Sequence, residues 1–540
     1  MDKNKHGLMG VELLHNAAHN KSTAFTEQER DQYGLRGLLP PAVGTMKTQI
    51  QRVLANMRRK ESDIEKYIFL SMLQDRNERL FFRLIMDNFQ ELLPIVYTPT
   101  VGQACREFAS IFRTEKGFYV TARDRGKIRK ILDNWPNRDV RIIVITDGGR
   151  ILGLGDLGAN GMGIPLGKLG LYCACAGISP DQTLPVMFDV GTNNEELIED
   201  PIYLGLRQPR LQGDEYFSLM DEFIEAAQDA FPGVLIQFED FTADNAFTHL
   251  NAYREKALCF NDDIQGTASV VLAGIYASTR FSGVDFRDLK FLFLGAGSAA
   301  TGMGNLIVEA LIESGLDEAE AVQRLWFFNR QGLIRKGLPS LPDYIQRYAH
   351  DVEECELLEA IDIHRPDILI GATGTPATFT QELVRKMASI KSKPGIFALS
   401  NPTSRAECTA EEAYQWTDGR AVFASGSPFD DINYDGRLIR PGQGNNAYIF
   451  PGVGLGAIVC KARLIPDEMF LVAAKVLAES LTDEDIEHSS VYPRVEKIRR
   501  VSLNIATAVA TYAWDNDISQ LPRPDNIESH IEEFMYDPTY

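Results

Sequence analysis

Apolar residues recur at helical intervals in the first part of the chain. Ile64, Ile68 and Met72 follow one another every four residues, which is the period of one face of a helix. This pattern predicts helices from about residue 49 to about residue 112.

Two prolines interrupt the helical pattern and flank a tyrosine. Pro94 and Pro99 stand on either side of Tyr97, so we expect a turn between them. A tyrosine held in a fixed orientation suits a proton donor. The alternative is a packing residue whose hydroxyl is simply hydrogen-bonded.

Short apolar runs alternate with helical patterns in the rest of the chain. This alternation predicts an α/β fold whose parallel sheets are buried on both faces. The first series of predicted strands is Ile142 to Ile145, Val186 to Val190 and Leu235 to Phe238. The second series is Phe291 to Leu294, Leu325 to Phe328, Ile368 to Ile370, Ile396 to Leu399 and Val422 to Ala424. The predicted helices among and after them include Thr267 to Ser278 and Val501 to Trp514.

Residues with little or no side chain follow the first strand of the second series. Gly295, Gly297, Ser298 and Ala300 stand where that strand turns into a helix. Glycine at such a turn lets a pyrophosphate approach backbone N–H groups and the positive end of the helix. The next predicted strand arrives at the distance expected of a βαβ unit. The passage therefore predicts a dinucleotide-binding fold.

The residue that ends this next strand bears on the choice of dinucleotide. It is Asn329, at the position where an acid that binds the ribose is usual. An amide does not repel a 2′-phosphate, and Arg330, Arg335 or Arg347 could pair with one. The sequence permits NADP and leaves NAD open.

Two acidic pairs precede the dinucleotide passage. Glu239-Asp240 and Asp262-Asp263 lie 23 residues apart, and an aromatic residue stands shortly before each pair. Two like charges about 4 Å apart repel by roughly 4 kcal/mol at an effective dielectric of about 20, and a divalent cation relieves that repulsion. The pairs predict a metal-dependent enzyme. The alternative is that such acids only cap helices or face water.

A second glycine cluster extends from Gly153 to Gly163 without an evident helix start. We interpret it as a loop that lets a substrate approach the backbone. Arg150 precedes the cluster and Lys168 follows it. Arg150 could hold a substrate carboxylate through two hydrogen bonds, and a desolvated Lys168 beside a metal could act as a base. The alternative for each is a surface role.

Asparagines in two later loops are further candidates for binding. Asn401 follows a predicted strand, and Asn445 and Asn446 lie in a glycine-containing loop. Their amides could donate hydrogen bonds to a carboxylate or to the nicotinamide ribose. Turn formation is the alternative.

Composition narrows the class of protein. The 540 residues suffice for two or three domains. The net charge of −20, without a basic block, argues against a nucleic-acid partner. Seven scattered cysteines indicate reduced thiols, as in the cytoplasm. No N-terminal targeting segment and no apolar stretch of membrane-spanning length is evident.

Several motifs together resemble the malic enzymes, from about residue 30 to beyond residue 500. The matching motifs are Val96 to Gly102, Thr146 to Asp156, Gly163 to Lys168, Gln237 to Asp240, Phe260 to Thr267 and Pro441 to Asn446. The resemblance implies oxidative decarboxylation of L-malate to pyruvate and CO2 with NAD or NADP and Mg²⁺ or Mn²⁺. It also implies a homo-oligomer, either a dimer or a tetramer.

The resemblance further implies a role for each matching residue. Glu239, Asp240 and Asp263 would bind the metal, and Asp263 would also lie at the cofactor. Lys168 would be the general base, Tyr97 the general acid, and Asp262 the partner of Lys168. Arg150, Asn401, Asn445 and Asn446 would bind substrate, with Arg150 and Asn401 also reaching the cofactor. Arg52 and Arg76 match positions that bind an activating dicarboxylate in some relatives, and surface ion pairing is their alternative.

Together these inferences predict four consecutive parts and one main function. We expect an N-terminal helical region (1–115), an α/β substrate- and metal-binding domain (116–262), a Rossmann-type doubly wound dinucleotide domain (263–445) and C-terminal helices packing back on the substrate domain (446–540). The alternatives to a malic enzyme are a malolactic enzyme, which releases lactate, and a non-catalytic protein that senses dinucleotides.

Overall fold

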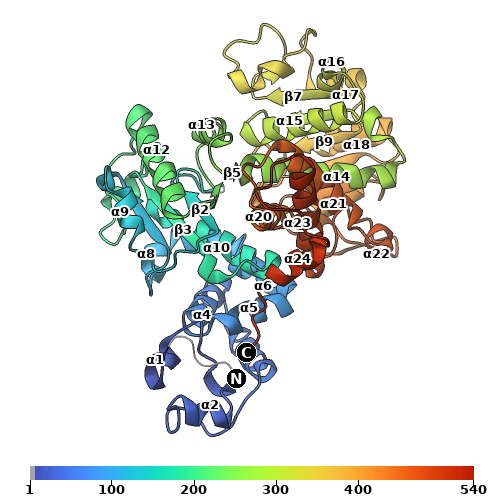
Figure 1. The fold of residues 1–540 in the computed structure, drawn as a ribbon. Helices are drawn as coiled ribbons and strands as arrows, with labels where there is room; N and C mark the ends of the chain where they lie inside the picture. Colours follow the sequence, from blue (N-terminus) through green and yellow to red (C-terminus); the bar gives the residue numbers. More distant parts are fainter. Residues whose placement is uncertain (1–6, 152) are drawn as a thin grey trace.

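The computed structural model describes residues 7–151 and 153–540 (Figure 1). The polar segment from Met1 to His6, which entered the prediction about targeting, lies outside the described residues. The N-terminal region is helical, as predicted. Its α-helices are α1 (Gly10–His15), α2 (Glu27–Gln32), α3 (Met46–Met57), α4 (Asp63–Arg76), α5 (Glu78–Asp87), α6 (Phe89–Val96), α7 (Thr100–Arg106) and α8 (Phe108–Ile111).

The apolar stripe that predicted α4 is not its buried face. Leu70 and Leu73 are buried, whereas Met72 is 56% exposed. The period therefore identified the helix but not the side that packs.

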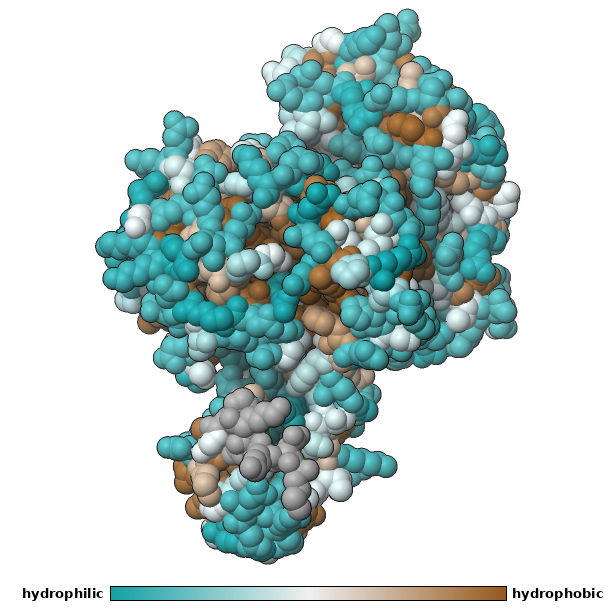
Figure 2. All heavy atoms as spheres, in the orientation of Figure 1, coloured by the Kyte–Doolittle hydropathy of each residue, from teal (hydrophilic) through white to brown (hydrophobic). Residues whose placement is uncertain are grey.

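The face shown in Figure 2 is mostly hydrophilic, with hydrophobic side chains gathered in the middle of the main body.

The expected turn begins later than the two prolines suggested. Pro94 lies inside α6, which ends at Val96, and Tyr97 caps its C-terminus. The prediction of a turn was right for Tyr97 to Pro99 and wrong for Pro94.

The first sheet has five parallel strands in the order β1-β3-β2-β4-β5. They are β1 (Phe118–Thr121), β2 (Ile142–Thr146), β3 (Thr183–Asp189), β4 (Leu235–Phe238) and β5 (Cys259–Asn261). The helices of this part are α9 (Ile128–Leu132), α10 (Gly163–Leu171), α11 (Glu195–Glu199), α12 (Gly213–Ala230) and α13 (Ala243–Tyr253). Because β2, β4 and β5 are parallel neighbours, the residues that follow them meet at one edge.

The second sheet has seven strands in the order β14-β11-β10-β9-β6-β7-β8. They are β6 (Phe291–Leu294), β7 (Leu325–Asn329), β8 (Gly332–Leu333), β9 (Ile368–Gly371), β10 (Gly395–Ala398), β11 (Val422–Ser425) and β14 (Gly442–Gln443). A separate hairpin pairs β12 (Ile432–Tyr434) with β13 (Arg437–Ile439). The sheet is parallel except for β8, which runs antiparallel to β7. The chain leaves β6 for β7 on one side and returns to β9 on the other, which creates the crevice where doubly wound folds bind ligands.

Helices cover the second sheet and join it to the rest. They are α14 (Thr267–Ser282), α15 (Ser298–Glu313), α16 (Glu318–Gln323), α17 (Leu357–His364), α18 (Gln381–Ile390) and α19 (Ala410–Trp416). The C-terminal helices are α20 (Phe450–Val459), α21 (Asp467–Glu479), α22 (Asp483–Glu487), α23 (Ile498–Asp515) and α24 (Ile527–Phe534). Helix α21 packs on α14, and α20 packs on α23 and also contacts β4.

The C-terminal residue packs on the N-terminal helical region (Figure 1). The Tyr540 hydroxyl donates to Gln49 of α3 at 3.0 Å and accepts a hydrogen bond from Asn77 at 2.7 Å. All seven cysteines are free thiols, and Cys173 and Cys175 are core residues, as predicted. No helix among the described residues is long and apolar enough to cross a membrane.

Candidate active site

Lys168 lies at the centre of the candidate site. It projects from α10, and its side chain is only 1% exposed. Its ammonium forms an ion pair with Asp262 and lies 3.0 Å from a carboxylate oxygen of Glu239. Burial alone would lower the pKa of Lys168, but the charges of Asp262 and Glu239 outweigh burial and raise it well above its usual range. In this arrangement Lys168 is a charged donor.

Two aromatic rings complete the surroundings of this ammonium. Lys168 Nζ lies 4.4 Å from the ring centroid of Phe450 and 5.5 Å from that of Tyr97. Gly167 permits the second contact, because a Cβ there would stand 3.3 Å from the Tyr97 ring. Burial raises the pKa of the Tyr97 hydroxyl, so the phenol keeps its proton. The predicted acid and base are thus neighbours.

The predicted metal ligands approach one another at the end of the first sheet. Glu239 and Asp240 follow β4, and Asp263 lies in the helical turn Asp262–Gly266 after β5. The backbone N–H of Asp240, whose φ is 54°, donates to Asp263 at 2.8 Å. Burial and then nearby carboxylates raise the pKa of Glu239, although Lys168 opposes the shift.

These carboxylates do not form a ready coordination shell. Glu239 faces Lys168, and within residues 7–151 and 153–540 no three His, Cys, Asp or Glu side chains are already grouped to hold a metal ion. The metal-binding role of Glu239, Asp240 and Asp263 therefore stays a prediction.

The loop that follows β2 brings Arg150 to the same edge. The Arg150 N–H donates to the carbonyl of Asp240 at 3.1 Å, and its side chain is exposed. Burial raises the pKa of Asp263, and the positive charge of Arg150 is among the influences that oppose this shift. An exposed guanidinium beside a buried anionic cluster is available to a substrate carboxylate.

The predicted asparagines differ in what they contact. Asn446 donates to Asp262 Oδ2 at 3.0 Å and so joins the Lys168 cluster. The side chain of Asn445 instead accepts from the N–H of Ala447 at 2.9 Å, which is the turn-forming alternative. Asn401 accepts from Ser427 at 2.7 Å. Their binding roles stay predictions.

A glycine contact joins the two sheets at the site. A Cβ on Gly153, in the loop after Arg150, would lie 3.2 Å from the carbonyl oxygen of Asn401, which follows β10. This loop therefore approaches the backbone of Asn401, whereas the approach of a substrate to the loop stays a prediction. The candidate substrate site and the dinucleotide crevice adjoin.

The dinucleotide passage has the predicted strand-turn-helix form. Gly295 follows β6 with φ +109°, and a Cβ there would lie 2.4 Å from the carbonyl oxygen of Ala372 after β9. Gly297 is the N-cap of α15, Ser298 begins the helix and Ala300 is buried in it. Only glycine fits at 295, because both its backbone conformation and its neighbour exclude a side chain.

Asn329 ends β7, and its side chain accepts from the N–H of Gln331 at 2.7 Å. Of the nearby arginines, Arg335 and Arg347 form ion pairs with Glu354 and Glu318. Arg330 is exposed directly beside Asn329.

Sequence reasoning missed the residues that support Glu239. Gln237 donates to Glu239 at 2.9 Å and accepts from the Tyr172 hydroxyl at 2.6 Å. All three are buried. A glutamine inside an otherwise apolar strand was the available signal, since a buried amide needs a partner.

Comparison with known proteins assigns the chain to a family. Residues 74–254 match the family model for the malic enzyme N-terminal domain, and residues 264–514 match that for the malic enzyme NAD binding domain. The chain belongs to the malic enzyme family. The resemblance found in the sequence is confirmed: as a malic enzyme the protein is an oxidoreductase that decarboxylates malate oxidatively, and it uses a nicotinamide dinucleotide.

Individual malic enzymes match over nearly the whole chain. The NADP-dependent malic enzyme of Phaseolus vulgaris is 50% identical over 536 residues, which cover 98% of this chain and 91% of that protein. The NADP-dependent malic enzyme of Dictyostelium discoideum is 47% identical, with 98% of each chain covered. The chloroplastic NADP-dependent malic enzyme of Flaveria pringlei is 49% identical, with 98% and 83% covered.

Solved malic enzyme structures share the fold. The Entamoeba histolytica malic enzyme superposes with a TM-score of 0.58 at 21% identity, covering 94% of this chain and 91% of that one. The malic enzyme from Pyrococcus horikoshii Ot3 gives 0.55 at 23% identity, with 83% and 89% covered. The predicted α/β class with a Rossmann-like part is thereby confirmed.

Replacing Gly295 and replacing Gly297 in the dinucleotide turn should have different effects, the first on stability and the second on dinucleotide affinity. Gly295→Ala forces a Cβ into the backbone of Ala372, so we expect a loss of about 2 kcal/mol or more in stability. Gly297→Ala meets no atom within 4 Å and has φ −83°, so its melting temperature should hold while its Kd for the dinucleotide rises. Calorimetry and titration measure both. A stable Gly295→Ala protein with unchanged Kd would refute this account of the turn.

Proposed function

We propose that this protein converts L-malate to pyruvate and CO2 with NADP as oxidant and Mg²⁺ or Mn²⁺ as activator. The observation that carries the proposal is the buried cluster of Lys168, Asp262 and Glu239 beside Tyr97, next to Arg150. In this proposal Lys168 is the base, Tyr97 is the acid and Arg150 binds a carboxylate of the substrate. All three would act at the edge where the dinucleotide crevice begins. These are the groups that oxidation and decarboxylation of a 2-hydroxy acid require.

The chemistry of the cluster fits a divalent cation. Four acidic groups, Glu239, Asp240, Asp262 and Asp263, face two basic ones, Lys168 and Arg150, which leaves two negative charges in excess. Carboxylate oxygens are the ligands that Mg²⁺ and Mn²⁺ prefer. Glu239, Asp240 and Asp263 would hold the ion, while Asp262 stays with Lys168.

The chain's own residues divide the reaction among them. A cation held by Glu239, Asp240 and Asp263 would supply polarisation of the C2 oxygen, and a dinucleotide at the turn after β6 would supply the hydride acceptor for C2. Arg150 holds a substrate carboxylate, and Lys168 accepts the proton of the 2-hydroxyl. After CO2 leaves, the Tyr97 phenol donates a proton to C3. Asp262 and Asn446 orient Lys168. Because Asp262 and Glu239 raise the pKa of Lys168, its action as a base requires that one of these carboxylates be drawn away from it, and Glu239 is the one that would hold the cation.

NADP is the preferred dinucleotide in this proposal. Asn329 places a neutral amide where a carboxylate would repel a 2′-phosphate, and the exposed Arg330 adjoins it. The malic enzymes of Phaseolus vulgaris, Flaveria pringlei and Dictyostelium discoideum, which are 47% to 50% identical to this chain, are each named as NADP-dependent.

The remaining proposals concern assembly and location. Exposed apolar side chains in the N-terminal helical region support a homo-oligomer of two or four chains: Met9, Val11, Leu38, Val43 and Met72. Seven free thiols suit the cytoplasm. The four-part division predicted from sequence, and an effector role for the exposed Arg52 and Arg76, belong to this proposal too.

Removing the base should stop turnover without releasing the dinucleotide. For Lys168→Ala we expect kcat to fall by about 10²- to 10⁴-fold, with the NADP Kd unchanged. Lys116→Ala is the control, because Lys116 is likewise an ion-paired lysine, bound to Asp75 at 2.8 Å, but is partly exposed and lies outside the cluster. Steady-state rates and fluorescence titration measure the two effects. Turnover near the wild-type rate would remove Lys168 from the mechanism.

The cation-binding role of Asp263 is open to direct titration. Asp263→Asn should raise the Kd for Mn²⁺ on the order of 10-fold or more, because one of the anionic oxygens is lost. Asp244→Asn is the control, since Asp244 is exposed in the first turn of α13. Paramagnetic titration of Mn²⁺ reports binding without turnover. Equal affinities in the two variants would exclude Asp263 as a ligand.

The choice of dinucleotide should respond to one charge. Asn329→Asp places a carboxylate near the 2′-phosphate, which costs about 1 to 3 kcal/mol. We therefore expect kcat/KM for NADP to fall on the order of 10- to 100-fold, with that for NAD kept or raised. Asn329→Ser controls for loss of the amide without a new charge. If the ratio of kcat/KM for NADP to kcat/KM for NAD is unchanged, another residue selects between the two dinucleotides.

A further inference from the structure

Arg210 joins the two ends of the loop that carries Arg150. The loop leaves β2 at Asp147 and returns at Asp156, and Arg210 comes from the separate segment between α11 and α12. The side chain of Arg210 is 9% exposed. A guanidinium buried to this degree needs specific partners.

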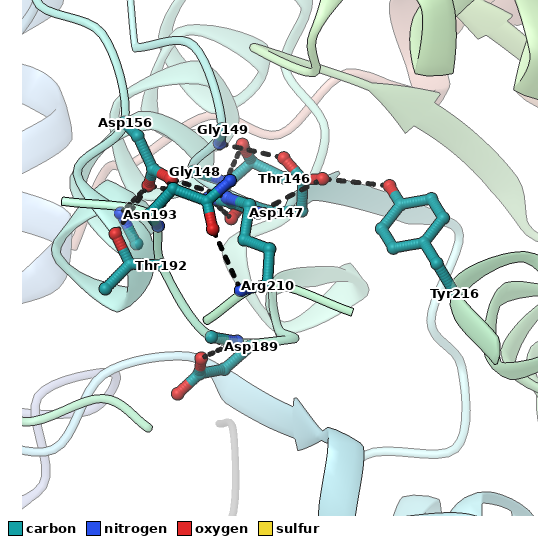
Figure 3. Close-up of polar contacts among 12 residues, drawn as sticks. Thr146, Asp147, Gly148, Gly149, Asp156, Asp189, Thr192, Asn193, Arg210 and Tyr216 are labelled. Carbon is teal, nitrogen blue, oxygen red and sulfur yellow. Dashed lines mark hydrogen bonds and ion pairs between the residues drawn. The ribbon is translucent and has the colours of Figure 1, made fainter. Parts of the chain in front are cut away.

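Its partners are the first and last residues of the loop (Figure 3). Nε and Nη2 donate to the two carboxylate oxygens of Asp156 at 2.7 and 2.8 Å. Nη2 also donates to the backbone carbonyl of Asp147 at 2.8 Å, and Nη1 lies 3.4 Å from its carboxylate. The planar fork fixes distance and angle together, which a lysine ammonium does not.

Each carboxylate is held on its other side as well. Asp147 accepts from the N–H of Gly149 at 2.8 Å and from the Tyr216 hydroxyl at 2.9 Å. Asp156 accepts from the Gly158 N–H at 2.9 Å, and from Thr192 Oγ1 and the Asn193 N–H at 2.8 Å each. Because other groups also hold each carboxylate, the two aspartates have little freedom to follow a displaced Arg210.

The two ends of the loop are packed closely against each other. The Leu157 N–H donates to the Gly148 carbonyl at 3.0 Å, and a Cβ on Gly148 would lie 2.0 Å from the Gly158 oxygen. Gly148 at the start of the loop therefore lies against Leu157 and Gly158, just beyond its end. The Arg150 N–H donates to the carbonyl of Asp240, so this loop places Arg150 beside the acidic cluster. A shift of the loop ends would strain that hydrogen bond and displace Arg150.

We propose that Arg210 is a positioning residue that sets the place of Arg150 at the substrate carboxylate. The inference rests on the proposed function, in which Arg150 binds malate. In the part of the chain that the structure describes, the guanidinium of Arg210 contacts neither Lys168 nor the proposed metal ligands Glu239, Asp240 and Asp263. Its effect passes through the loop and should fall on substrate binding.

Arg210→Lys tests this because it keeps the charge and loses the fork. We expect KM for malate to rise on the order of 10- to 100-fold, with kcat within about 3-fold and the NADP Kd unchanged. Arg30→Lys is the matched control: Arg30 is also buried, and it donates to the carbonyls of Phe25 and Pro40 in the N-terminal region. That variant should keep the wild-type KM. An unchanged KM in Arg210→Lys would overturn the proposal.

A double-mutant cycle separates positioning from general damage. In an Arg150→Ala background, Arg210→Lys should raise KM less than about 3-fold further, because the group it positions is gone. Full additivity would overturn the proposal. Should Arg210→Lys fail to fold, Tyr216→Phe removes one donor to Asp147 and should raise KM about 3-fold; no change would count against the inference. Wild-type protein that does not turn over malate would instead contradict the proposed function itself.

Discussion

One buried ammonium group organises this site. Lys168 is enclosed by Asp262, Glu239 and the rings of Tyr97 and Phe450. These groups come from four separate parts of the chain, and the ion pairs draw them to one point. Breaking a buried pair by removing one partner typically costs about 3 to 5 kcal/mol. The same interaction therefore holds α10 against the first sheet and brings the reacting groups together.

Sheet topology explains why residues far apart in sequence meet there. Strands β2, β4 and β5 are parallel neighbours, so the residues that follow them share one edge. The second sheet reverses its winding at β6 and β9, where Gly295 packs on Ala372. Contact between Gly153 and Asn401 joins these two edges. In the proposed function, substrate chemistry and dinucleotide binding are adjacent because both sites lie at carboxyl ends of parallel strands.

The sequence predicted what depends on local pattern. Strands β2, β3, β4, β6, β7, β9, β10 and β11 and the turn at Gly295 were predicted because apolar runs and a glycine with positive φ leave a signal in a few residues. Strand β5, which has three residues, is too short to leave that signal and was missed. The buried face of α4, the cap formed by Asn445 and the support of Glu239 by Gln237 depend on neighbours distant in sequence. Arg210 is the clearest case, since nothing near it in the chain indicates that Asp147 and Asp156 flank its guanidinium.

The account is tested most directly by measuring products and reduced dinucleotide together, with L-malate, Mn²⁺ and either NADP or NAD. It predicts that pyruvate and NADPH appear in equal amounts, that NADP supports the higher kcat/KM, and that chelation of the metal stops both. Lactate without accumulation of reduced dinucleotide, or turnover that survives chelation, would contradict it.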